Sequence, residues 1–172
     1  MDVALRKSRV DRRVRAAEKY LKDAALLHGA LNRASDTAYQ IELLAFEILL
    51  KATVLAYGGT PTRSHQYRKL FDLLPDLVQS RIIERAANRM GPHANYSDVA
   101  GLLTTFTRNF EKLRYDFEDY DEFTDEKYEE LGREWLAAGA LLESGTFVHR
   151  STELSGFVDA LQTELEDWRR IH

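Results

Sequence analysis

The sequence predicts an all-α protein, an up-and-down bundle of helices around one apolar core. The composition is rich in Ala, Leu, Glu and Arg and poor in Gly and Pro, which favours helix over sheet. Apolar residues recur at intervals of three and four along most of the chain. The segment 41–57 is apolar nearly all round, as expected of a helix in the middle of a bundle.

The first two helices are expected to form an antiparallel hairpin. The first spans about 11–31, and Ser35 suits the cap of the second, which continues to about Tyr57. Gly58-Gly59 should end it, since glycine tolerates the left-handed conformation. The later segments are a loop at 60–64, a short helix near 67–74, a helix with Pro75 in its first turn that ends at 91–92, a helix capped by Ser97 whose apolar stripe reaches Phe117, a helix over 124–142 and a last helix over 152–171.

The length suits a single domain, 1–172, with a core of about 10–120 and a C-terminal helical extension of about 121–172. The absence of cysteine excludes a disulfide framework and a cysteine nucleophile and fits a reducing cytoplasm. The chain begins with charge instead of a secretory signal, so we expect a cytoplasmic protein. Glu42, Glu47 and Lys51 interrupt the longest apolar segment, so no membrane role is expected.

Charge is distributed unevenly although the net charge is only −4: the amino end is basic and a late segment is acidic. One interpretation is two solvated helix faces that attract each other within or between chains. The other is that the basic amino end contacts RNA phosphates, although it lacks interleaved aromatic residues. The basic residues are Arg6, Lys7, Arg9, Arg12, Arg13 and Arg15, and the acidic ones are Asp116, Glu118, Asp119, Asp121, Glu122, Asp125, Glu126, Glu129 and Glu130.

The histidines do not form a metal-binding pattern. A dimetal site in a helical bundle needs Glu-x-x-His pairs that point into the core, and no histidine follows a glutamate at that spacing. We therefore expect no metal and no cofactor. The histidines are His28, His65, His93, His149 and His172.

Polar residues on the apolar second helix are the first candidates for a site. Glu47 and Lys51 lie one turn apart in the orientation that favours an ion pair. They either fix helix packing as an internal pair, or Glu47 orients an arginine or a general base in a cleft. His65 either braces the loop or serves a catalytic role, but the sequence names no partner that would orient it.

Arg108, Arg114 and Tyr115 stand among aromatic residues in the long helix. They either form surface ion pairs with Glu111 and Glu118 or bind phosphate.

Three segments together resemble the HEPN domain superfamily over about residues 10–120: 17–24 (AEKYLKDA), 45–52 (AFEILLKA), and Gly59-Thr60-Pro61 with His65 and Leu70. The resemblance implies a bundle of four or five helices that usually dimerises, with the functional cleft at the dimer interface. Many members are metal-independent endoribonucleases of toxin–antitoxin, antiphage or RNA-processing systems.

The ribonuclease signature of that family is an arginine, a polar residue and a histidine four to six residues after the arginine. Arg108-Asn109 matches the first two places, but Arg114 stands at the histidine place. An arginine stays protonated, so it stabilises charge but cannot relay the proton of an attacking ribose hydroxyl. The adjoining Tyr115 resembles the Arg-Tyr pair of some HEPN-like families, which suggests an altered or non-catalytic branch.

The leading hypothesis is a HEPN-like homodimer of a prokaryotic defence or toxin–antitoxin system that binds RNA or a nucleotide through Arg108 and Arg114. The alternative is a metal-independent endoribonuclease with an atypical site of Arg108, Asn109, Arg114 and Tyr115, supported by Glu47. A third possibility is a non-catalytic scaffold or partner of a toxin–antitoxin pair, whose acidic segment binds a basic protein.

Overall fold

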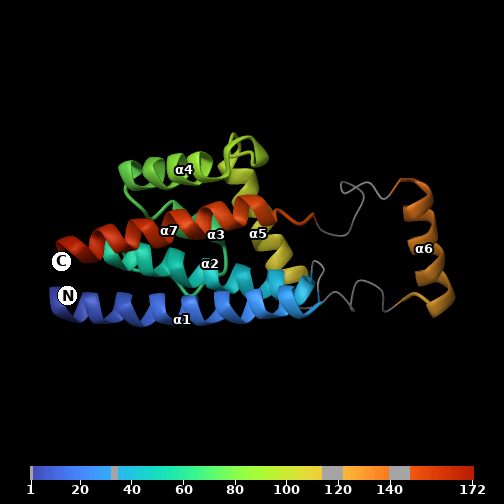
Figure 1. The fold of residues 1–172 in the computed structure, drawn as a ribbon, viewed down its shortest axis with the longest axis horizontal. Helices are drawn as coiled ribbons and strands as arrows, with labels where there is room; N and C mark the ends of the chain where they lie inside the picture. The colour runs from blue at the N-terminus through green and yellow to red at the C-terminus, as the bar shows by residue number, and fades with distance from the viewer. Residues whose placement is uncertain (1, 32–34, 114–121, 140–147) are drawn as a thin grey trace.

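The computed structural model describes residues 2–31, 35–113, 122–139 and 148–172, and every regular element in these ranges is a helix (Figure 1). This confirms the all-α prediction. None of the described helices combines the length and the apolar character needed to cross a bilayer. The elements are α1 (Val3–Leu31), α2 (Asp36–Ala56), α3 (Tyr67–Phe71), α4 (Asp76–Met90), the 3-10 helix η1 (Gly91–His93), α5 (Val99–Lys112), α6 (Asp125–Ala137) and α7 (Ser151–Ile171).

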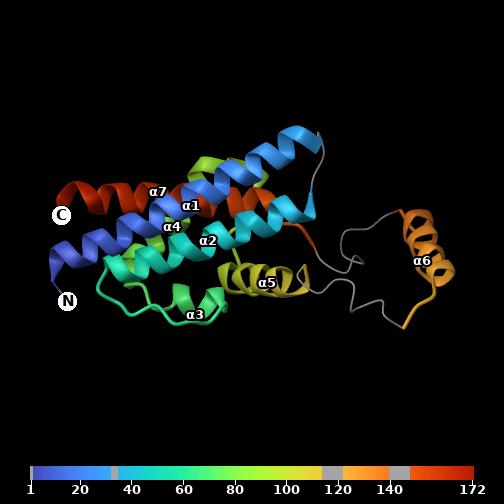
Figure 2. The same cartoon turned by 90° about the horizontal axis from the view of Figure 1, so that it is seen from below.

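Helices α1 and α2 form the predicted antiparallel hairpin and lie side by side in both views (Figure 1, Figure 2). Ser35 caps α2, as predicted, by accepting a hydrogen bond from the backbone N–H of Ala38 at 3.3 Å. Helix α1 begins well before Asp11, the expected start. The reason is a tertiary contact: Lys7 Nζ donates to the Arg169 carbonyl at 3.3 Å, which docks the early turns of α1 on the end of α7.

Helix α2 occupies the centre of the bundle and packs against α1, α3, α5 and α7. Aromatic rings from several elements meet around it, mostly edge to face, an arrangement that adds to the free energy of apolar burial. The Phe46 ring lies 5.3 Å from Tyr67, 5.7 Å from Phe106 and 5.9 Å from Phe157. The predicted stop at Gly58 is confirmed, since its φ of 85° is in the left-handed region.

Helix α7 contributes a row of buried apolar side chains to this core. It packs against α2 and α4, and its buried apolar residues follow the expected stripe. Its buried side chains belong to the same core cluster as those of α2, α3, α4 and α5. The buried apolar side chains of α7 are Leu154, Phe157, Val158, Ala160, Leu161, Leu165 and Trp168.

Two further helix starts differ from the prediction. Asp98 caps α5 by accepting a hydrogen bond from the Gly101 N–H at 2.8 Å, and the expected cap, Ser97, is wrong. The reason is that the Ser97 N–H donates to Asn95 Oδ1 at 2.9 Å, which keeps Ser97 in the preceding turn. Pro75 is the cap of α4 instead of a residue of its first turn. The expected ends at 117 and 142 lie outside the described residues.

We expect Phe157→Ala to lower the free energy of unfolding by about 3–5 kcal/mol, because it removes a fully buried ring that contacts four other aromatic residues. Denaturation in urea measures this difference. Leu77→Ala is the control, since Leu77 is 76% exposed and its truncation should cost less than about 1 kcal/mol. A similar small cost for Phe157→Ala would show that α7 is not packed in the core.

Candidate functional site

A buried carboxylate on α2 holds two basic groups near the surface. Glu47 Oε1 accepts a hydrogen bond from Lys51 Nζ at 2.7 Å, which confirms the expected ion pair. Glu47 Oε2 lies 2.8 Å from His65 Nδ1. The Glu47 side chain is 5% exposed, Lys51 is 18% exposed and His65 is 46% exposed. We refer to Glu47, Lys51 and His65 as the Glu47 cluster.

Contacts with α5 hold the loop that carries His65. The Thr107 hydroxyl accepts a hydrogen bond from the Tyr67 N–H at 3.1 Å and lies 3.5 Å from the His65 carbonyl oxygen. The His65 ring lies 5.3 Å from the ring of Phe110, also on α5. Since Gly58 reverses the chain after α2, the loop returns along that helix and brings His65 to Glu47.

This geometry suits proton transfer or anion binding. In the tautomer that carries its proton on Nδ1, the His65 ring donates to Glu47 and presents Nε2 as an acceptor. A carboxylate that orients an imidazole in this way is the arrangement that serves general bases. When His65 is protonated, the Glu47 cluster carries one positive charge in excess, which attracts an anion.

The two described residues of the expected phosphate site face different directions. Arg108 is exposed, and its side chain makes no hydrogen bond or ion pair with another described residue. Asn109 is 0% exposed, since successive residues of a helix point about 100° apart and Asn109 shares the core side with Phe106 and Phe110. Within the described residues, the structure therefore does not join Arg108 to Asn109 in one site. Arg114 and Tyr115, like Glu118, lie outside the described residues.

Asn109 instead belongs to a polar group at the start of α7. Its Nδ2 donates to the Val148 carbonyl at 2.8 Å and to the Tyr39 hydroxyl at 3.4 Å, and that hydroxyl also accepts from the Arg150 N–H at 3.3 Å. The His149 ring stacks on Tyr39 with 4.6 Å between centroids. Burial raises the pKa of Tyr39, which keeps the phenol protonated as a donor and acceptor. These contacts anchor the beginning of α7 to α2 and α5.

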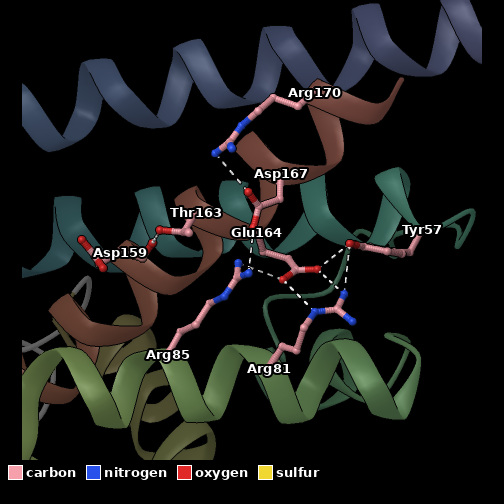
Figure 3. A network of polar contacts seen from close by, with 8 residues as sticks. All are labelled: Tyr57, Arg81, Arg85, Asp159, Thr163, Glu164, Asp167 and Arg170. Atoms are coloured by element: carbon pink, nitrogen blue, oxygen red, sulfur yellow. Dashed lines mark hydrogen bonds and ion pairs between the residues drawn. The ribbon is translucent and has the colours of Figure 1, made fainter.

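A second buried carboxylate, Glu164 on α7, joins three helices (Figure 3). Arg81 donates to it from Nε at 3.2 Å and from Nη2 at 2.5 Å, and the Tyr57 hydroxyl also donates to it. Arg85 Nη1 lies 3.1 Å away and Arg85 Nη2 donates to Asp167 at 2.7 Å. Because Glu164 is 1% exposed and both of its oxygens are engaged, it serves helix packing.

The Glu164 network shifts the pKa values of its members. Burial alone would raise the pKa of Glu164, but hydrogen bonds from Arg81 and Tyr57 outweigh it and lower the value. Burial and the adjacent Glu164 carboxylate raise the pKa of Tyr57 to about 12. The carboxylate therefore stays ionised and the phenol stays neutral at physiological pH.

In the described part of the chain, His, Asp and Glu side chains do not gather in a group of three that could hold a metal ion. A cavity of about 260 Å³ opens between α1, α2, α4 and α7, and Glu42, Arg89 and Asp159 are among its lining residues. The Glu47 cluster does not line this cavity.

We expect Glu164→Gln to lower the free energy of unfolding by about 1.5–3 kcal/mol at neutral pH, because the arginines lose a charged acceptor. The pKa of Glu164 is lower in the folded state than in the unfolded state. The ionised carboxylate therefore stabilises the fold above the unfolded-state pKa of about 4.3, and this contribution is lost as the pH falls through the folded-state pKa. The difference between wild type and Glu164→Gln should thus narrow in acid. Denaturant unfolding between about pH 3 and pH 7 tests this.

The control is Glu166→Gln, which removes an exposed carboxylate from the same helix and should cost little at any pH. If the stability difference between wild type and Glu164→Gln stayed constant into strong acid, the assigned ionisation of Glu164 would be wrong.

Comparison with known proteins shows which family the chain is similar to. The family described as the HEPN domain matches residues 10–132. The search of curated proteins and the search of solved structures found no match. The matched range contains the Glu47 cluster, Arg108 and all helices from α1 to α5 except the first turns of α1. This confirms the resemblance noted from the sequence, and the chain belongs to the HEPN domain family.

Proposed function

We propose that this protein binds RNA or a nucleotide by its phosphate groups, as a homodimer in a prokaryotic defence or toxin–antitoxin system. The observation that supports binding most directly is the Glu47 cluster, in which one buried carboxylate holds Lys51 and His65 at the surface. The biological context, the cytoplasmic location and the homodimer rest on family membership.

Preorganisation is the physical argument for binding at the Glu47 cluster. Glu47 fixes both basic groups through contacts shorter than 3 Å, so a ligand need not freeze two flexible side chains. His65 is nearly half exposed, which lets an anion reach its ring. The exposed Arg108 adds a guanidinium on α5, a group suited to bidentate contact with phosphate.

In the proposed dimer, Arg108 and Arg114 of each protomer contact phosphate near the two-fold axis. Arg108 supports this arrangement because it makes no polar contact with the described residues of its own chain. As far as the described residues are concerned, its guanidinium is open to a ligand or to the second protomer.

A metal-independent endoribonuclease is the second candidate, favoured by the contact between Glu47 and His65. Arg114 cannot accept the proton of a ribose 2′-hydroxyl, whereas the oriented His65 imidazole can. Asn109 is buried and serves packing, so it is not placed to accept this proton. In an enzyme with the atypical Arg/Asn/Arg/Tyr site, His65 would be the group that accepts it. Arg108 would then stabilise the charge that develops on the phosphate.

We expect His65→Ala and Arg108→Ala each to weaken binding of a fluorescently labelled RNA about tenfold, because each change removes one charge-assisted hydrogen bond to phosphate. Fluorescence anisotropy at low salt measures the affinity. The control is Arg133→Ala on α6, which removes an exposed arginine with a 70% exposed side chain. Unchanged affinity in both site variants would contradict the proposed binding site.

Cleavage separates the two candidates. Incubation of the wild-type protein with RNA in excess chelator should leave the RNA intact if the protein only binds. Cleavage that persists in chelator and is lost in His65→Ala would establish the endoribonuclease and refute the binding-only function. If RNA neither binds nor is cleaved while a Lys/Arg-rich protein copurifies through the acidic segment, the scaffold hypothesis is correct instead.

A further inference from the structure

The outward face of α1 carries a continuous row of basic side chains. All five are exposed, and they follow one another at intervals of three or four residues, so they lie along one side of the helix. At about 1.5 Å per residue the row is about 20 Å long. We define the α1 basic row as Arg9, Arg12, Arg15, Lys19 and Lys22.

The α1 basic row points directly away from the core. The buried positions of α1, Val10, Val14, Ala17 and Ala24, occupy the opposite side of the helix. The row therefore contributes nothing to the packing of α1 against α2. It was placed on the surface by the same periodicity that places Val10 and Val14 inside.

Within the described residues, most of this charge is not neutralised. Arg12, Arg15, Lys19 and Lys22 make no ion pair or hydrogen bond with other described residues. Carboxylates also adjoin the row on α1: Asp11 is engaged by Arg169 Nε at 2.8 Å, and Glu18 and Asp23 stand four residues from Lys22 and Lys19. Burial, together with the like charges of Arg9 and Arg12, lowers the pKa of Arg13 next to the row.

This arrangement costs stability in the free protein. Like charges three or four residues apart repel each other on a helix, by about 0.2–0.5 kcal/mol for each pair. The row is also locally positive in a chain whose net charge is −4. A bound polyanion would relieve the repulsion.

The side chains of the row indicate which polyanion fits. A protein partner would need apolar contact at the centre of its interface, but the exposed leucines Leu5 and Leu26 lie beyond the two ends of the row, and its middle offers the small side chain of Ala16. Exposed aromatic side chains, on which bases would stack, do not occur along it. Cations that have no aromatic platform beside them contact phosphates and do not read bases.

We propose that the α1 basic row binds the sugar-phosphate backbone of an RNA strand, independently of base sequence. This proposal rests on the proposed function only in that RNA is the polyanion. The RNA strand would thus contact two surfaces of the protein, the Glu47 cluster and the α1 basic row.

The test uses the full chain with Arg12→Gln, Arg15→Gln and Lys19→Gln combined, and a labelled single-stranded RNA of about 20 nucleotides. Each phosphate contact adds about 0.7 to the slope of log affinity against log salt concentration, so the triple variant should lose about 2 from that slope. We expect its affinity at low salt to fall more than tenfold. Anisotropy titrations at several salt concentrations measure both quantities for two RNA sequences, and the loss should be equal for both.

The matched control combines Arg89→Gln, Lys127→Gln and Arg170→Gln, three exposed cations on α4, α6 and α7 that pair with carboxylates. It makes the same change in net charge and should leave the salt slope near the wild-type value. The thermal midpoint of the row variant should be equal to or above that of wild type, because repulsion along α1 is reduced.

The outcomes separate this proposal from the proposed function. If the row variant binds RNA with the wild-type slope while His65→Ala weakens binding, the α1 proposal is wrong and the proposed function stands. If the row variant keeps wild-type RNA binding but changes the oligomeric state in sedimentation, the row is a protein interface and the α1 proposal is likewise wrong. Binding that falls in the row variant, while a nucleoside monophosphate still binds as to wild type, supports two distinct surfaces.

Discussion

Helix α2 buries the Glu47 carboxylate in the middle of the bundle, where an unpaired charge would cost several kcal/mol. Two basic groups remove that cost, Lys51 from the next turn of the same helix and His65 from the following loop. The loop must therefore return along α2, and Thr107 and Phe110 on α5 hold it there. The position of the candidate site thus follows from the need to pair one buried charge.

Glu47 and Glu164, two of the buried carboxylates among the described residues, are both paired with basic groups, but in different ways. Glu164 is enclosed by Arg81, Arg85 and Tyr57, so its oxygens are used in joining α2, α4 and α7 (Figure 3). Glu47 has partners that reach toward solvent, and His65 is the most exposed of them. A closed network of this kind holds helices together, whereas an open one presents oriented polar groups to a ligand.

Periodicity and capping chemistry predicted the helices well, because both are local properties of the sequence. The pair Glu47 and Lys51 was predictable from its spacing of four residues. The contact of His65 with Glu47 was not, since it depends on how a loop docks on α5. The spacing of Asn109 from Phe106 and Phe110 indicates a buried position, whereas the family signature alone would place Asn109 in the site.

Imidazole nitrogen resonances offer the most direct test that Glu47 positions His65. In ¹⁵N–¹H correlation spectra of labelled protein, we expect the neutral form of the His65 ring to carry its proton on Nδ1, from which it is donated to Glu47. We expect that preference to disappear in Glu47→Gln while the helical content stays unchanged. A His65 ring that carries its proton mainly on Nε2, with spectra that Glu47→Gln does not alter, would contradict the account.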